Sequence, residues 1–174
     1  MKKLTRFSLF ALVLTIAFSF DAQAQKFSDL DKSPMDLAAY PARAAEKTVK
    51  VYYSRPQLKG RDLSTLAPNG KVWRTGANES TEITFYKDVN FGGQQVKAGT
   101  YSLFTIPGEK EWTVILNSAI NGWGSYAYKE ANDVARVNVP VNNGEAVEAF
   151  AIAFDDNGSM HMAWGNVRVA VSIE

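Results

Sequence analysis

Apolar and polar residues alternate with a period of two along much of the chain beyond Thr48. Val49, Val51 and Tyr53 give the first clear example, and similar segments recur between Gly, Pro and Asn residues. Short alternating runs with such boundaries are typical of strands joined by turns. The pattern predicts strands at residues 49–53, 81–86, 100–106, 112–116 and 134–139, and a small hairpin at residues 88–97 that turns at Gly92-Gly93.

The last third of the chain has the strongest alternation. Strands are predicted at residues 146–154, 159–164 and 167–173, with Gly165-Asn166 as a two-residue hairpin loop. This loop would pair Trp164 with Val167 and Met162 with Val169. One face of the hairpin would then enter the core, namely Met160, Met162, Trp164, Val167, Val169, Val171 and Ile173, and the other would carry His161, Arg168 and Ser172.

These segments predict an all-β fold: a single antiparallel β-sandwich of jelly-roll or Greek-key type, with about nine strands. Only residues 118–132 interrupt the alternation. This stretch contains Gly122-Trp123-Gly124, Tyr126 and Tyr128, and we expect a long aromatic loop with a helical turn near residues 129–133.

The N-terminal residues have the composition of an export signal. Residues 1–24 contain a basic start, an apolar run from Phe7 to Phe20 and Ala22-Gln23-Ala24 before the expected cleavage at Gln25. The apolar run is shorter than the roughly 20 residues of a membrane-spanning helix. We therefore expect a periplasmic or extracellular protein without a stable membrane anchor. Residues 25–47 would form a lead-in arm with a helical turn at residues 36–39, and residues 48–174 the β-sandwich domain.

The charge and the cysteine content of the chain limit the classes of ligand and partner that it can bind. The whole chain has 19 Lys and Arg and 18 Asp and Glu, and residues 1–24 hold three of the basic and one of the acidic side chains. The remainder is nearly neutral, with 16 basic and 17 acidic residues, which predicts no binding to nucleic acid. With no cysteine and one histidine, the chain forms no disulfide and lacks the usual zinc ligands. We expect no metal and no cofactor; the oligomeric state stays open.

Two polar stretches are candidates for a binding site. Guanidinium groups bind carboxylate, phosphate or sulfate, aromatic rings such as Trp123 and Tyr126 can stack on sugars, and Glu79 can orient a hydroxyl or act as an acid or base. The candidate ligand-binding residues are Arg55, Lys59, Arg61, Trp73, Arg74, Asn78 and Glu79, and Glu79 is the one weak catalytic candidate.

A long motif string runs through the same stretches. It resembles a family of secreted bacterial proteins catalogued as a domain of unknown function, over residues from about Ser33 to the C-terminus. The resemblance implies export and a single domain, and it implies no activity. The motifs are YSRP, KGR, VWRTGANE, AGTYSLFTIPG and EWTVILN.

A purely structural interpretation of the second stretch competes with the binding site. Gly76 at a positive φ would form a tight turn, Asn78 would bind backbone amides, and Arg74 would pair with Glu79. His161, alone on a strand, is more typical of a surface or packing residue than of a catalytic group.

Three functions stay open from the sequence. The first is a binding protein for a small polar or saccharide ligand, in which the candidate residues converge in one cleft. The second is a cell-envelope hydrolase using Glu79 with a second carboxylate from Asp62, Glu82 or Asp133. The third is a structural or assembly protein of the envelope that uses the loop 122–128 as a contact surface.

Overall fold

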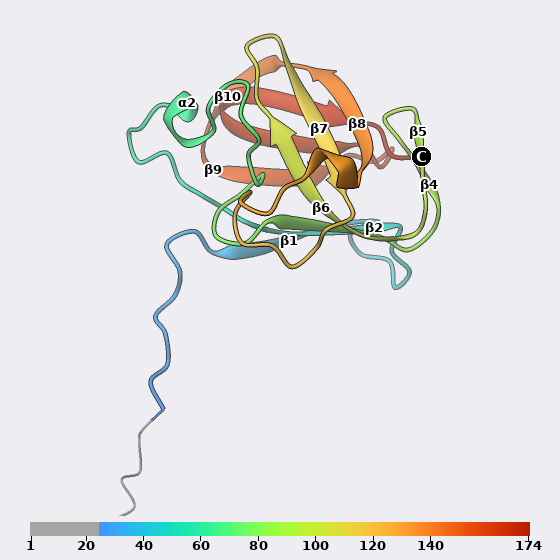
Figure 1. Cartoon of the computed structure of the whole chain (residues 1–174), viewed down its shortest axis with the longest axis horizontal. Coiled ribbons are helices and arrows are strands. Elements are labelled where there is room, and N and C mark those ends of the chain that lie inside the picture. Colours follow the sequence, from blue (N-terminus) through green and yellow to red (C-terminus); the bar gives the residue numbers. More distant parts are fainter. Residues whose placement is uncertain (1–24) are drawn as a thin grey trace, which may run out of the picture. The chain divides into compact units, whose positions relative to one another are not determined.

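The computed structural model describes residues 25–174, so the predicted signal at residues 1–24 lies outside the described residues. The strands of the described residues all lie in the compact unit Asp31–Glu174. Its elements are shown in Figure 1. In chain order they are β1 (Met35–Tyr40), β2 (Val49–Ser54), α2 (Leu63–Leu66), β3 (Thr81–Phe85), β4 (Val89–Phe91), β5 (Gln94–Val96), β6 (Gly99–Ile106), β7 (Glu111–Asn117), a 3-10 turn η1 (Glu130–Asn132), β8 (Asp133–Pro140), β9 (Asn142–Phe154) and β10 (Met160–Val171).

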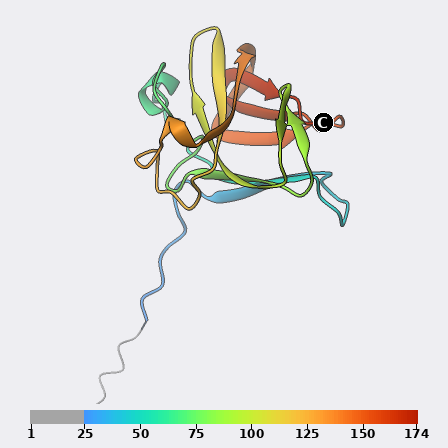
Figure 2. The same cartoon turned by 45° about the vertical axis from the view of Figure 1, so that its right-hand side comes forward.

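Six strands form one antiparallel sheet in the order β1-β2-β3-β6-β7-β8, and β9 and β10 form a long hairpin. The hairpin lies beside both edges of this sheet, because β9 contacts β1 and β10 contacts β8. Figures 1 and 2 show the sheet curving around the hairpin. The all-β antiparallel sandwich is confirmed, with ten strands in residues 25–174 where about nine were expected.

The core between the sheet and the hairpin is built from the alternating inward residues of both. Val49, Val51 and Ile83 are fully buried in the sheet. An aromatic cluster fills the centre: Trp73 lies edge-on to Trp112 with ring centroids 6.0 Å apart, and edge-on to Phe150 at 5.1 Å. Packing of large aromatic side chains stabilises a domain that has no disulfide.

The predicted hairpin at Gly165-Asn166 is wrong. β10 runs without interruption from Met160 to Val171, and its residues from Met160 to Arg168 pair with β9. Gly165 has a φ of 53° and marks a register shift on both of its sides, because β10 advances two residues from Ala163 to Gly165 while β9 advances four. This irregularity reverses the alternation, as a hairpin loop would. The predicted core face is therefore correct although the turn is not: Met162, Trp164 and Val169 are buried.

The helical turn expected at residues 36–39 is also wrong. This part of the predicted arm is β1, an edge strand in which Leu37 faces Tyr52 and Ala38 faces Val51 of β2. Leu and Ala are strong helix formers, but intrinsic propensity is a weak determinant of structure, and pairing with a neighbouring strand overrides it. The arm thus supplies one strand of the main sheet.

The other strands predicted from the alternation are confirmed, although β9 begins at Asn142, before the predicted start at residue 146. The small hairpin β4–β5 turns at Gly92-Gly93, and the 3-10 turn η1 ends the aromatic loop that follows β7. Within residues 25–174, no helix has the length and apolar character needed to cross a membrane.

Candidate functional site

Arg55 directly follows β2 and is held by contacts to two other strands. Its Nη1 lies 3.0 Å from Oδ2 of Asp36 in β1, and its Nε donates to the carbonyl of Phe150 in β9 at 3.0 Å. These contacts tie the residue that follows β2 to β1 in the same sheet and to β9 in the long hairpin. The guanidinium group therefore has a structural role that accounts for two of its donors.

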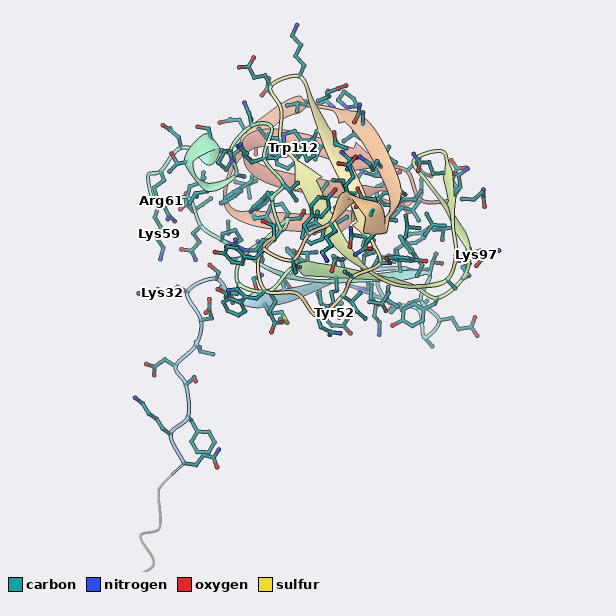
Figure 3. All side chains as sticks on the ribbon, in the orientation of Figure 1. Lys32, Tyr52, Lys59, Arg61, Lys97 and Trp112 are labelled. Atoms are coloured by element: carbon teal, nitrogen blue, oxygen red, sulfur yellow. The ribbon has the colours of Figure 1, made fainter. Side chains whose placement is uncertain are left out.

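Lys59 and Arg61 lie on the loop between β2 and α2. Arg61 donates from Nε to the carbonyl of Leu58 and from Nη2 to that of Gln57. Its guanidinium group therefore hydrogen-bonds within its own loop. The backbone N–H of Lys59 donates to Oε1 of Glu148 at 2.6 Å. Figure 3 places both side chains beside α2, away from Tyr52 on the outer face of β2. Neither residue lines a hollow that contains Glu79.

The segment from Trp73 to Glu79 folds into the edge of the core. Trp73 is 5% exposed, and its Nε1 donates to the carbonyl of Gly76 at 3.1 Å. Its ring therefore packs in the interior and offers no face to a ligand in solution. Arg74 lies partly buried beside it, and its Nε has no hydrogen-bond partner in the described part of the chain.

The predicted turn chemistry of this segment is wrong in detail. The positive φ angles belong to Thr75 (54°) and Asn78 (60°), and Gly76 is not among the residues with positive φ. Gly76 is needed for a close approach instead, since a Cβ there would meet the carbonyl oxygen of Ser54 at 3.0 Å. Among the described ion pairs, none joins Arg74 to Glu79.

Glu79 is exposed at the end of this segment, directly beside the aromatic loop. An isolated antiparallel bridge pairs it with Trp123. Backbone hydrogen bonds flank the bridge: Ser80 N–H donates to Gly122 at 2.8 Å, and Gly124 N–H donates to Asn78 at 2.9 Å. The loop is thereby fixed alongside residues 78–80, and Trp123 is 62% exposed next to Glu79.

Two hollows adjoin at Glu79 and Met35, which line both of them. We call them together the Glu79 groove. The first has a volume of about 270 Å³ and the second about 280 Å³. The first is lined by Met35, Tyr52, Glu79, Ser80, Glu82, Asn121 and Gly122, and the second by Asp31, Ser33, Met35, Ser54, Asn78, Glu79 and Trp123.

The charge of the Glu79 groove is negative. Asp31, Glu79 and Glu82 line it, no Lys or Arg does, and none of the three takes part in a described ion pair. Glu82 Oε1 accepts the backbone N–H of Asn121 at 2.7 Å, and Asp31 Oδ1 accepts that of Ser33 at 2.6 Å. Carboxylates accept hydrogen bonds from hydroxyl and amine groups and repel anions.

A buried polar network holds the far end of the aromatic loop. Asp133, whose side chain is 6% exposed, accepts from Arg136 at 2.6 Å, from the Tyr128 hydroxyl at 2.7 Å and from Asn117 at 2.7 Å. Burial, followed by the hydrogen bond to Asp133, raises the pKa of Tyr128 to about 12. The hydroxyl therefore stays protonated, and the network fixes the loop against β7 and β8.

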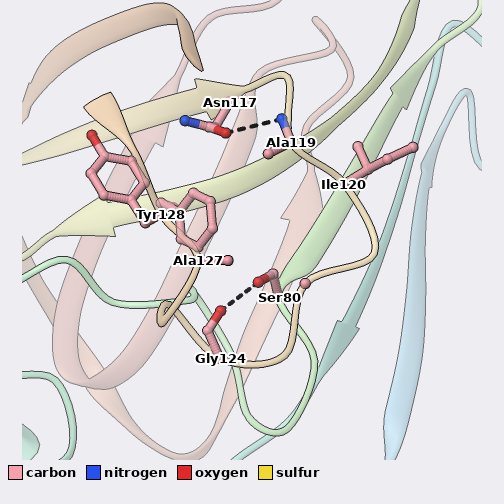
Figure 4. A pocket seen from close by; sticks show the side chains of 9 residues that line it. Ser80, Asn117, Ala119, Ile120, Gly124, Ala127 and Tyr128 are labelled. Atoms are coloured by element: carbon pink, nitrogen blue, oxygen red, sulfur yellow. Dashed lines mark hydrogen bonds between the residues drawn. The ribbon is translucent and has the colours of Figure 1, made fainter. Parts of the chain in front are cut away.

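A small cavity lies under the same loop and is shown in Figure 4. Its volume is about 30 Å³, which is room for little more than a water molecule. The Ser80 hydroxyl donates to the carbonyl of Gly124 on its wall. This cavity is thus part of the loop's packing rather than a ligand site.

The three carboxylates considered as partners of Glu79 lie in different places. Glu82 lines the same hollow, Asp133 is committed to the network just described, and Asp62 precedes α2 at another hollow of about 330 Å³. The aromatic residue of that last hollow, Trp112, is almost completely buried, so it offers little ring face. Of these three carboxylates, only Glu82 lines a hollow together with Glu79.

Residues 25–174 contain no group of three or more His, Asp or Glu side chains placed to hold a metal ion. His161 lies on the outer face of β10, with Nε2 2.9 Å from Oδ2 of Asp155. That hydrogen bond lowers the pKa of Asp155, whose other oxygen accepts the N–H groups of Asn157 and Ser159. The pair stabilises the β9–β10 turn.

The structure thus separates the seven candidate residues. Asn78 and Glu79 line the Glu79 groove, Trp73 is in the core, and Arg55, Lys59, Arg61 and Arg74 do not line it. Sequence reasoning missed Met35, Asp31 and Tyr52. The signal for Tyr52 was available, because it is a large aromatic residue at an outward position of an alternating strand.

Comparison with known proteins gives one match. The family described as Protein of unknown function (DUF2911) matches residues 33–173. No curated protein and no solved structure matches the chain.

Proposed function

The chain belongs to this family, and we propose that it is an exported protein that binds an uncharged saccharide in the Glu79 groove. The observation that carries the proposal is the pairing of Trp123 with Glu79 across an isolated bridge at the rim of a hollow. An exposed indole offers a flat apolar face for a sugar ring, and adjacent carboxylates accept hydrogen bonds from its hydroxyl groups.

Two further observations support a neutral ligand over an anionic one. The groove is lined by three carboxylates and by no basic side chain. The arginines at positions 55 and 61 donate to protein carbonyls elsewhere. A phosphate, sulfate or uronate would meet like charge in the groove, which is unfavourable at short range.

The test is a binding screen of the purified chain against neutral, acidic and amino-substituted oligosaccharides. Neutral sugars are expected to bind, and Trp123→Ala should weaken binding about tenfold, the equivalent of one lost stacking contact. Tyr126→Ala is the matched control, because Tyr126 is 88% exposed on the same loop and lines neither hollow. Preferential binding of acidic sugars, or binding that Trp123→Ala leaves unchanged, would contradict the proposal.

Export is part of the same proposal and rests on the composition of residues 1–24. N-terminal sequencing of the protein recovered from outside the cytoplasm should begin at Gln25. Recovery of the intact chain from the cytoplasm alone would contradict it.

A hydrolase is the second candidate, favoured because Glu79 and Glu82 line one hollow. A pair of carboxylates is the requirement for glycosidic hydrolysis by acid–base catalysis. Release of new reducing ends from a bound oligosaccharide, abolished by Glu79→Gln, would support it. Binding of an oligosaccharide without release of any product over a long incubation would contradict the hydrolase and support a binding protein.

A structural or assembly role is the third candidate, favoured by the exposure of Tyr126 outside both hollows. Sedimentation over a range of concentrations tests it. Self-association that Tyr126→Ala removes would support it, and a monomer at all concentrations with no co-purifying partner would contradict it.

A further inference from the structure

The two hollows of the Glu79 groove are lined by the same kinds of side chain. One holds the aromatic ring of Tyr52 and the carboxylate of Glu82, and the other holds Trp123 and Asp31. Met35 and Glu79 belong to both. The groove therefore repeats an aromatic-plus-carboxylate arrangement on two sides of a shared centre.

We propose that the groove binds a saccharide chain across two adjacent subsites, one sugar unit against Tyr52 and the next against Trp123, with the linkage between them at Met35 and Glu79. This inference rests on the proposed function and adds the length of the ligand to it. It makes a single sugar an incomplete ligand.

The two aromatic residues are positioned by independent parts of the fold. Tyr52 lies on the outer face of β2, opposite Leu37 of β1 and Glu82 of β3 in the register of the sheet. Trp123 is held by the loop bridge to Glu79. Because strand pairing fixes one ring and the loop fixes the other, the distance between the two subsites is set before any ligand arrives, which limits the entropy lost on binding.

The volumes suit one sugar unit in each hollow. Each hollow, at about 270 and 280 Å³, lies just below the range of small-molecule sites, which begins at roughly 300 Å³. A ligand confined to one hollow would touch one aromatic ring only. A ligand that spans both would contact Tyr52 and Trp123 and bring Glu79 within reach of hydroxyl groups beside the linkage.

Polar groups that suit hydroxyl ligands are distributed over both subsites. In the first, the backbone N–H of Asn121 donates to the side-chain carboxylate of Glu82. Ser33, Ser54 and Asn78 line the second. Hydroxyl and amide groups both donate and accept, as a neutral sugar requires.

The experiment is calorimetric titration of the full domain with neutral β-linked glucose oligomers of increasing length, together with N-acetylglucosamine oligomers of the same lengths. The affinity should rise about tenfold or more from one unit to two and change little after about three, because one further stacking contact contributes roughly 1–2 kcal/mol. Trp123→Ala and Tyr52→Ala should each remove the gain from the second unit, whereas Tyr126→Ala should keep it.

Two results would overturn the inference. If a single sugar binds as tightly as its oligomers, there is one subsite, and the saccharide-binding proposal survives alone. If the affinity climbs steadily through longer oligomers, the site extends beyond the two hollows. Failure of every sugar at every length would instead remove the proposed function itself. Unchanged thermal unfolding of the variants shows that lost affinity is not lost folding.

Discussion

The indole ring of Trp73 stacks on that of Trp164, with ring centroids 5.3 Å apart and planes inclined by 17°. Trp73 belongs to the segment between α2 and β3, and Trp164 to the middle of β10. The contact joins the six-stranded sheet to the hairpin that faces it. Trp73 also hydrogen-bonds through its backbone to Thr105 of β6, so the stack is attached to the sheet at 2.7 Å and 2.9 Å.

Removal of one ring from this stack should destabilise the domain severely. Trp164→Ala is expected to lower the free energy of unfolding by about 3–5 kcal/mol, because the side chain is fully buried and leaves a cavity. Trp123→Ala, at an exposed ring, should change it by less than about 0.5 kcal/mol. Urea denaturation measures both, and equal effects of the two substitutions would contradict the placement of Trp164 in the core.

Gly92 and Gly93 allow a matched pair of substitutions. Both have positive φ, 57° and 92°, but a Cβ on Gly92 would lie 2.5 Å from Cγ1 of Val137, whereas one on Gly93 meets nothing within 4 Å. Gly92→Ala should lower the free energy of unfolding by about 3 kcal/mol, because backbone strain and steric overlap add together. Gly93→Ala should lower it by about 1 kcal/mol from strain alone. Thermal unfolding that ranks Gly93→Ala as the worse substitution would show that the close contact is absent.

Tyr128 predicts an alkaline loss of stability. The folded state raises its pKa to about 12 through burial and the hydrogen bond to Asp133, against about 10 in an unfolded chain. The stabilisation is complete below pH 10 and is lost as the pH rises toward about 12. Tyr128→Phe should flatten the decline of the unfolding free energy over that interval. Tyr126→Phe, on an exposed ring, should leave the decline as it is, and an equal effect of both would contradict the assignment.

Asp155 predicts an acid dependence with the opposite sign. Its pKa is lowered, first by the hydrogen bond to His161 and then by backbone N–H groups. Such a carboxyl stabilises the fold above its unfolded pKa of about 3.9, and the contribution disappears as the pH falls through the lower folded value. Asp155→Asn should reduce the slope of stability with pH in this acid range. His161→Gln should reduce it in part, since the N–H groups of Asn157 and Ser159 remain.

Most of the strands could be predicted because one of their faces is buried, and burial imposes a period of two on the sequence. Two features could not. Gly165-Asn166 has the composition of a hairpin loop, and only the long pairing of β9 with β10 reveals it as an irregularity within a strand. Residues 35–40 contain helix-favouring Leu and Ala, and their strand depends on pairing with β2, the next strand along the chain.

The candidate site was harder to predict, because a sequence does not show which polar side chains already hydrogen-bond within the protein. Arg55 and Arg61 look like ligand-binding groups until their donors are seen to reach the carbonyls of Phe150 and Leu58. Glu79, Asn78 and the exposed Trp123 were recognised as polar or aromatic residues outside the strands. The alternation of β2 indicates that Tyr52 faces outward, but its place beside Glu82 depends on the pairing of β2 with β3.

The side chain of Gln94 has a consequence for how copies of this protein meet. Its amide donates to the carbonyl of Arg136 at 2.7 Å and accepts the N–H of the same residue at 3.4 Å, as a neighbouring strand would. The edge of β8 is thus occupied at this point, and β9 lies along β1 at the opposite edge. A sheet whose edges are already covered offers no template on which a second chain can add a strand, which is how β-rich proteins avoid growing into fibres.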